Sequence, residues 1–174
     1  LTHAQGQVSI ALQGAQVLTW IPKGQAPVVW LSSDARFQAS KSLRGGAPVC
    51  WPWFGAHSQD PSKPAHGFAR NLDWEVLETS ATQAGTRIVL GFTPGQAQHA
   101  LWPHQASLTL TVTLGEALSL VLTTRNTGAE PITITQALHT YFHVGDIAGA
   151  RVEGLSGCEY IDKAVSGDPC IRQE

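Results

Sequence analysis

The clearest pattern in the sequence is a strict alternation of apolar and polar residues over 107–114. Successive side chains of a strand point to opposite faces, so the pattern predicts a strand with one buried face. Residues 117–125 return in the same phase, and Gly115 with Glu116 favours a two-residue type II′ hairpin turn between them. The apolar positions of the first run are Leu108, Leu110, Val112 and Leu114.

Shorter runs, of which 27–31 is fully apolar, predict further strands on both sides of this hairpin. Turn residues separate them, and no segment shows a convincing helical period. Consecutive strands joined by short turns predict an all-β fold, an antiparallel β-sandwich. The runs cover residues 7–13 and 16–21 (a hairpin-like pair), 27–31, 74–79, 86–92 and 131–138.

Residues 32–70 have no periodicity and are instead rich in glycine, proline and aromatic residues. Such long loops in compact domains are usually either functional or disordered. The segment contains Trp51, Trp53, Phe54 and Phe68, whereas disordered segments are poor in aromatic residues. We therefore predict an ordered, functional loop region.

Histidine is placed unusually at the end of the 131–138 run. Ile132, Ile134 and Leu138 share one parity, and His139 has the other, so its imidazole should point away from the apolar face. A polar sheet face lined by Thr, Arg and His would suit a hydroxyl-rich ligand, while plain solvent exposure is the alternative. His139 is thus either a catalytic group or an ordinary surface residue.

The composition restricts the class of protein. A chain of 174 residues predicts one domain, or part of a larger one. Its formal net charge of −2 lacks the basic footprint of nucleic-acid binding, and no apolar run reaches the ~18 residues of a membrane span. Three cysteines without CxxC spacing favour reduced thiols in a cytoplasmic protein.

The chain contains no methionine and begins at Leu1. An intact translation product begins with Met, so we expect a processed or trimmed N-terminus. We also expect residues 1–174 to be a single β-sandwich domain that is the N-terminal part of a longer one.

Two arginines in the aromatic loop region are candidate anion ligands. Arg44 precedes two glycines, and Arg70 closes the segment 66–70. The guanidinium of arginine can bind phosphate through two parallel N–H donors. The alternative is structural pairing of each arginine with a carboxylate, for which the candidates are Asp34, Asp60 and Asp73.

His66 and His139 are candidate acid/base groups, because imidazole titrates near neutrality. A zinc site that also uses His57 and His143 competes with this hypothesis, but no H-x₃-H or HExxH spacing supports it. A serine nucleophile has no G-x-S-x-G motif. His99 and His104 are interpreted as structural or surface residues.

Several motifs together resemble the aldose 1-epimerase (galactose mutarotase-like) superfamily, in particular its hexose-6-phosphate mutarotase, or glucose-6-phosphate 1-epimerase, branch. The resemblance implies an antiparallel β-sandwich that holds the sugar on a concave sheet face, with no metal and no organic cofactor. The matching segments are 43–55 with RGG, 64–70 with HGFAR, 101–104, 138–142 with HTYF, and 154–162.

Residue by residue, the resemblance implies that His139 is the general acid that protonates the ring oxygen. His66 is implied to be the second active-site histidine, which holds or polarises sugar oxygens. Arg44 and Arg70 are implied to bind the 6-phosphate. The expected activity is interconversion of the α and β anomers of a hexose 6-phosphate. The alternatives are an aldose 1-epimerase for unphosphorylated sugars and a non-catalytic carbohydrate-binding protein.

The resemblance also implies two residues that the sequence does not contain. The family's general base is a glutamate far towards the C-terminus, and a sugar-binding aspartate follows a segment like 172–174. Glu174 is not that glutamate. We therefore expect a polypeptide of only these residues to be a poor enzyme.

Overall fold

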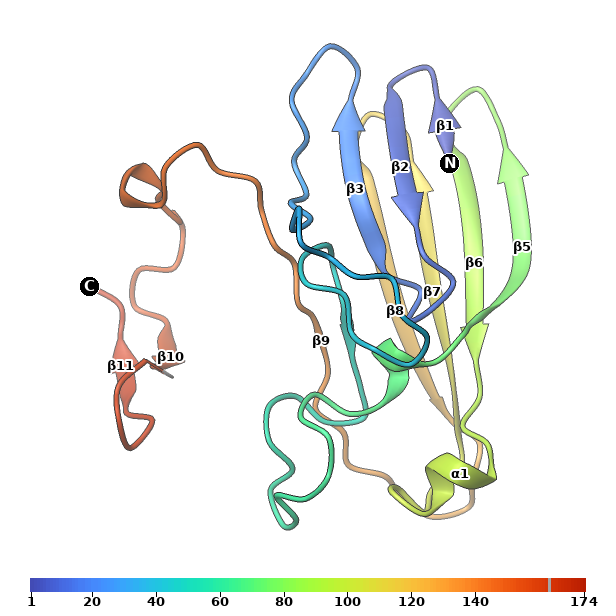
Figure 1. Ribbon diagram of the computed structural model, residues 1–174, viewed down its shortest axis with the longest axis vertical. Coiled ribbons are helices and arrows are strands. Elements are labelled where there is room, and N and C mark those ends of the chain that lie inside the picture. The colour runs from blue at the N-terminus through green and yellow to red at the C-terminus, as the bar shows by residue number, and fades with distance from the viewer. Residues whose placement is uncertain (163) are drawn as a thin grey trace. The chain divides into compact units, whose positions relative to one another are not determined.

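Four antiparallel strands form the largest sheet of the structure, in the order β5-β6-β7-β8 (Figure 1). Burial alternates at every residue of β7, where Leu110 is fully buried and Thr111 is half-buried. The strands and apolar face predicted for residues 107–114 and 117–125 are therefore confirmed. The four strands are β5 (Glu75–Ala81), β6 (Thr86–Phe92), β7 (Ala106–Leu114) and β8 (Leu118–Asn126).

This computed structural model describes residues 1–162 and 164–174. A second sheet, β1-β2-β3, packs against the apolar face of the first, and in Figure 1 β2 and β3 lie in front of β7 and β8. Val8 and Val17 belong to the same buried cluster as Leu110. The sandwich and its N-terminal hairpin are thus confirmed. The strands are β1 (Thr2–His3), β2 (Gly6–Ile10) and β3 (Val17–Pro22).

The aromatic loop region is held by short pairings rather than by long strands. β4 (Val49–Cys50) pairs antiparallel with β9 (Ala137–Leu138), and an isolated parallel bridge joins Trp51 to Gly67. Trp51 is fully buried, and the edges of Phe68 and Trp102 pack against its ring at 5.6 and 4.8 Å between centroids. The prediction that this loop is ordered is therefore confirmed.

Three predicted local features differ from the structure. Residues 27–31 form isolated bridges only, because Trp30 donates to Tyr141 while its carbonyl accepts from Gly46. Of residues 131–138 only the last two form a strand, since Pro131 has no N–H and the amide of Thr135 donates to the Pro52 carbonyl. The turn after β7 has three residues, because Leu114 pairs with Leu118.

The helical segments are short and lie in connections. In the described ranges, the helices are α1 (Gln96–His99) and the 3₁₀ turns η1 (Ala69–Asn71) and η2 (Ile147–Gly149). None of the described helices has the length and apolar character required to cross a membrane.

The contacts divide the chain into two units, Leu1–His143 and Val144–Glu174. The second unit contains the antiparallel pair β10 (Glu159–Ile161) and β11 (Cys170–Arg172). The structure has Cys50, Cys158 and Cys170 as free thiols. The single-domain assignment of residues 1–174 stays a prediction.

Candidate active site

The pairing of β4 with β9 brings the two candidate histidines together. Leu138 pairs with Val49 and packs on the core, and the His139 amide donates to the Pro48 carbonyl at 3.0 Å. The side chain of His139 must then point away from the core. On that side, the imidazoles of His139 and His66 lie 5.9 Å apart between ring centroids. The predicted direction of His139 is confirmed.

His66 is held in an uncommon backbone conformation. Its φ of 66° lies in the left-handed region, which few non-glycine residues adopt. The His66 amide donates to the Gly55 carbonyl at 2.7 Å. A Cβ at the following residue, Gly67, would collide with the carbonyl of Trp51, so only glycine fits there. The tight turn positions the imidazole while the chain returns to the core.

The tautomer of His66 follows from one hydrogen bond. The Gly55 amide donates to Nδ1 of His66 at 3.2 Å, so Nδ1 carries a lone pair and the neutral ring has its proton on Nε2. Burial lowers the pKa of His66, and the charges of Arg70 and His139 lower it further. The neutral imidazole is thus a hydrogen-bond donor through Nε2.

We predict that His66 titrates below the ordinary histidine value of about 6.5. Because the unfolded chain then binds more protons, this group's contribution to stability is complete above about pH 6.5 and decreases as the pH falls towards the lower folded-state pKa. Arg70→Gln should raise the pKa of His66, since Arg70 opposes its protonation. NMR titration of the ring nitrogens measures both effects.

Arg44→Gln is the matched control for this titration, because Arg44 is not among the charges that lower the pKa of His66. A pKa of His66 at or above 6.5, or equal responses to the two arginine variants, would contradict the assignment.

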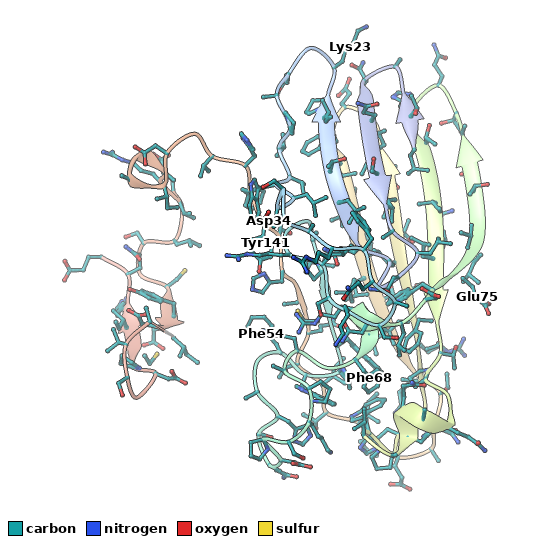
Figure 2. The ribbon with its side chains drawn as sticks, in the orientation of Figure 1. Lys23, Asp34, Phe54, Phe68, Glu75 and Tyr141 are labelled. Atoms are coloured by element: carbon teal, nitrogen blue, oxygen red, sulfur yellow. The ribbon has the colours of Figure 1, made fainter. Side chains whose placement is uncertain are left out.

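Two aromatic rings, Phe54 and Tyr141 (both labelled in Figure 2), flank the histidine pair. The centroid of Phe54 lies 5.0 Å from that of His66 and 5.9 Å from that of His139. Tyr141 lies 5.0 Å from His139. The Phe54 amide donates to Oγ1 of Thr135 at 2.9 Å, which fixes the backbone beneath this ring.

Sequence reasoning assigned no role to Phe54 or Tyr141, although both stand inside the quoted motifs. For Phe54, the available signal was an aromatic residue beside glycine in a non-periodic loop. The structure leaves Phe54 46% exposed, so its ring is available to contact a bound molecule.

The two arginines have few partners in the part of the chain that the structure describes. Arg70 donates from Nη2 to the Ala65 carbonyl at 3.0 Å, and its Nε is buried without a hydrogen-bond partner. Arg44 is exposed and makes no side-chain hydrogen bond to a described residue. The ion pair found among the described residues joins Arg87 to Glu78 and involves neither of these two arginines. Neither Arg44 nor Arg70 therefore pairs with a carboxylate of the described residues, and the alternative of structural pairing is wrong there.

Arg70 lies close enough to His66 and to Cys50 to act on both electrostatically. The charge of Arg70 opposes protonation of His66 and so lowers its pKa. Burial raises the pKa of the Cys50 thiol, and the charge of Arg70 partly offsets that rise. Arg44 is connected to the site through the backbone, because Gly46 accepts a hydrogen bond from the amide of Tyr141 at 2.9 Å.

The four histidines of the zinc hypothesis do not converge. The ring of His57 packs against Trp53, and His143 is exposed. Residues 1–162 and 164–174 contain no cluster of three or more His, Cys, Asp or Glu side chains that could hold a metal ion.

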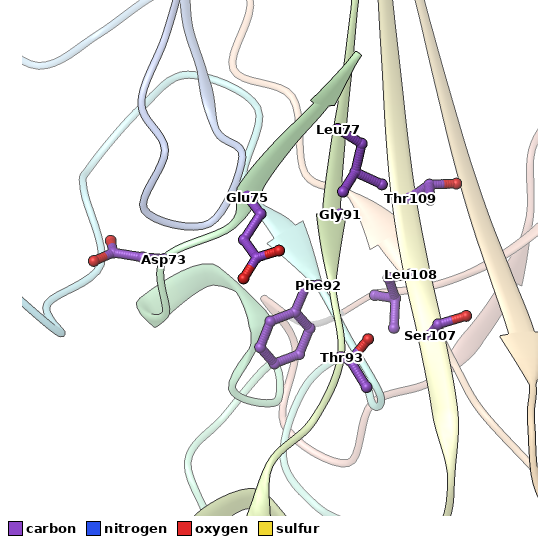
Figure 3. A pocket seen from close by; sticks show the side chains of 9 residues that line it. All are labelled: Asp73, Glu75, Leu77, Gly91, Phe92, Thr93, Ser107, Leu108 and Thr109. Atoms are coloured by element: carbon purple, nitrogen blue, oxygen red, sulfur yellow. The ribbon is translucent and has the colours of Figure 1, made fainter.

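The threonine-rich face of β7 is a different surface from the histidine site. It contains a cavity of about 360 Å³ on β5–β7, whose lining residues include Asp73, Glu75 and Thr109 (Figure 3). Two carboxylates would repel a phosphate. His139 instead contacts Phe54, His66 and Tyr141, none of which belongs to that sheet. The threonines of β7 and the histidine pair therefore do not share one sheet face, whereas Thr135, from the same run as His139, accepts the hydrogen bond of the Phe54 amide.

Residues 1–172 match the family described as Aldose 1-epimerase. Proteins of Escherichia coli K12 and Salmonella typhimurium, both named "Putative glucose-6-phosphate 1-epimerase", are 41% and 40% identical to this chain over 161 residues. Each alignment covers 92% of this chain and 53% of the relative, so the chain spans about half the length of these curated relatives.

A crystal structure of a "putative mutarotase (YeaD)" from Salmonella typhimurium superimposes with a TM-score of 0.87 at 38% identity. It covers 97% of this chain, which in turn covers 55% of that one. The Slr1438 protein from Synechocystis sp. PCC 6803, at 24% identity and a TM-score of 0.81, shares the fold. With its fold, its HGFAR and HTYF motifs and these relatives, the chain belongs to the aldose 1-epimerase family.

Proposed function

We propose that the complete protein containing this chain interconverts the α and β anomers of a hexose 6-phosphate. The observation that carries the proposal is the adjacency of His66 and His139, 5.9 Å apart between centroids, with the charge of Arg70 acting on His66 and no described carboxylate paired with that arginine. The relatives named as glucose-6-phosphate 1-epimerases support the phosphorylated substrate.

His139 is the proposed general acid. It gives a proton to the ring oxygen O5 as the C1–O5 bond breaks, while a base removes the proton of the C1 hydroxyl and C1 becomes an aldehyde. Rotation about C1–C2 exposes the other face, and the reverse proton transfers close the ring. The family resemblance assigns the base to a glutamate outside these residues.

His66 is the proposed orienting donor. Its neutral ring donates from Nε2 because Nδ1 is occupied by the Gly55 amide, and its lowered pKa favours this neutral form near neutral pH. Phe54 and Tyr141 flank His139 and would displace water from the sugar ring, which strengthens both hydrogen bonds.

The proposal needs no metal or organic cofactor and no macromolecular partner. Unpaired cysteines support a cytoplasmic location, because thiols stay reduced there. The family match over residues 1–172 spans both units, which supports their assignment to one β-sandwich domain.

Arg44 and Arg70 are the proposed 6-phosphate ligands. Arg44→Ala and Arg70→Ala should each raise KM for glucose 6-phosphate by about 10–100-fold, because a hydrogen bond to a charged group contributes about 1.5–3 kcal/mol. Activity on unphosphorylated glucose should change little in Arg44→Ala. Steady-state anomer exchange with both sugars measures the difference.

Arg125→Ala is the matched control, since Arg125 is an exposed arginine on β8. Equal losses on both sugars in Arg44→Ala would exclude a role in phosphate binding. Unchanged activity in both arginine variants would favour an epimerase of unphosphorylated aldoses. Sugar binding without any exchange would favour a non-catalytic binding protein.

A further inference from the structure

The ring of Phe54 contacts both candidate histidines. Its centroid lies 5.0 Å from that of His66 and 5.9 Å from that of His139. Phe54 is 46% exposed and lies outside the buried core cluster. Core packing therefore does not fix this ring, and its position depends on how the backbone of Phe54 is held.

The hydroxyl of Thr135 holds that backbone. It accepts a hydrogen bond from the Phe54 amide at 2.9 Å. The Thr135 amide in turn donates to the Pro52 carbonyl at 3.1 Å, and Pro52 has no N–H with which to return this hydrogen bond. The backbone pairing of the two segments thus stops at Pro52, and the Thr135 side chain provides the next hydrogen bond towards the ring.

The two histidines have anchors of their own. The amide of His66 donates to the Gly55 carbonyl at 2.7 Å, and Nδ1 of His66 accepts from the Gly55 amide at 3.2 Å. The amide of His139 donates to the Pro48 carbonyl at 3.0 Å. Loss of the Thr135 hydroxyl should therefore displace chiefly the aromatic ring and leave both imidazoles near their present positions.

We propose that Thr135 is a positioning residue for the anomer exchange and acts through the ring of Phe54. This inference rests on the proposed function. The ring presents an apolar surface to the C–H groups of the hexose, while the imidazoles beside it bind the sugar oxygens. Because a displacement of about 1 Å can cost about 10²-fold in rate, a hydrogen bond that sets the position of this ring affects catalysis without taking part in proton transfer.

Thr135→Val nearly preserves the shape of the side chain but removes the hydrogen-bond acceptor. In the complete protein, it should lower kcat for exchange of the glucose 6-phosphate anomers about 10-fold, because the displaced ring no longer confines the sugar. Thr135→Ser keeps the hydroxyl and should restore most of the rate. Thr133→Val is the matched control and should leave the rate unchanged, because Thr133 is exposed on the same run and forms no hydrogen bond to a described residue.

A double variant tests whether Thr135 acts through the ring. Phe54→Ala should lower the exchange rate at least as much as Thr135→Val does. In the Phe54→Ala protein, Thr135→Val should then cause no further loss, because the effects of coupled residues are not additive. Two losses that multiply would show independent effects and overturn the proposal. A rate in Thr135→Ser as low as in Thr135→Val would do the same, because the hydroxyl would then have no role.

A readout without turnover separates the positioning role from the proposed function. The ring current of Phe54 shifts the imidazole proton resonances of His66 and His139, and Phe54→Ala removes this shift. Thr135→Val should move the same resonances in the same direction, whereas Thr133→Val should leave them in place. Equal exchange rates in the two valine variants, or no movement of these resonances, would overturn the positioning role while the proposed function stands. Absence of exchange in the unsubstituted protein would instead overturn the proposed function, and the positioning role in this reaction with it.

Discussion

His139→Ala is expected to lower the rate of anomer exchange of glucose 6-phosphate by about 10²–10⁴-fold, the usual contribution of a positioned general acid. Methyl cannot protonate O5, so the ring would open only with a proton from water. The measurement is NMR exchange between anomers with the complete protein. It should be made in a buffer without phosphate, because free phosphate is itself an acid/base catalyst of this reaction.

His143→Ala is the matched control for this substitution. His143 is exposed, and only its amide forms a described hydrogen bond, to the carbonyl of Val28 at 2.8 Å. Its removal should leave the exchange rate unchanged. If His139→Ala retains the original rate while the protein remains folded, the acid assignment is wrong and another group must protonate O5.

Leu110→Ala should destabilise the protein by about 2–5 kcal/mol, the typical cost of a large-to-small change in a packed core. Leu110 is completely buried at the centre of β7. It pairs with Leu90 on β6 and with Leu122 on β8, so its removal leaves a cavity that neighbouring strands cannot easily fill. Urea denaturation followed by circular dichroism measures the change in the free energy of unfolding.

Val121→Ala is the control on the other face of the same sheet. Val121 lies on β8 with 52% of its side chain exposed, and its substitution should change stability by no more than about 0.5 kcal/mol. A loss equal to that of Leu110→Ala would mean that the outer face of this sheet is also buried in the complete protein.

The strands β7 and β8 could be predicted because their information is local. Successive side chains of a pleated strand point to opposite faces. When one face is buried, apolar and polar residues therefore alternate along the sequence. Residues 27–31 and 131–138 looked similar but form only short pairings. Their backbone donors go to partners chosen by the tertiary structure, such as the carbonyl of Pro52 for the amide of Thr135.

The turn after β7 was predicted incorrectly for a related reason. Gly115 is compatible with the positive φ of a type II′ turn, but it is not among the glycines that have one. The Gly115 amide instead donates to the carbonyl of Ala117 at 3.1 Å. Glycine permits a turn type without requiring it, so the register of β7 with β8 decided the loop length.

The sequence by itself determined the class of fold, the inward faces of β7 and β8 and the outward direction of His139, because each follows from a repeat of two residues. Only the tertiary structure decided that His66 lies beside His139, that Phe54 and Tyr141 flank them, and that Arg44 and Arg70 pair with no carboxylate of the described residues. These contacts join segments far apart in the chain through the pairing of β4 with β9 and the Trp51–Gly67 bridge. No local period records such pairings, because they depend on which distant backbone groups satisfy one another's hydrogen bonds.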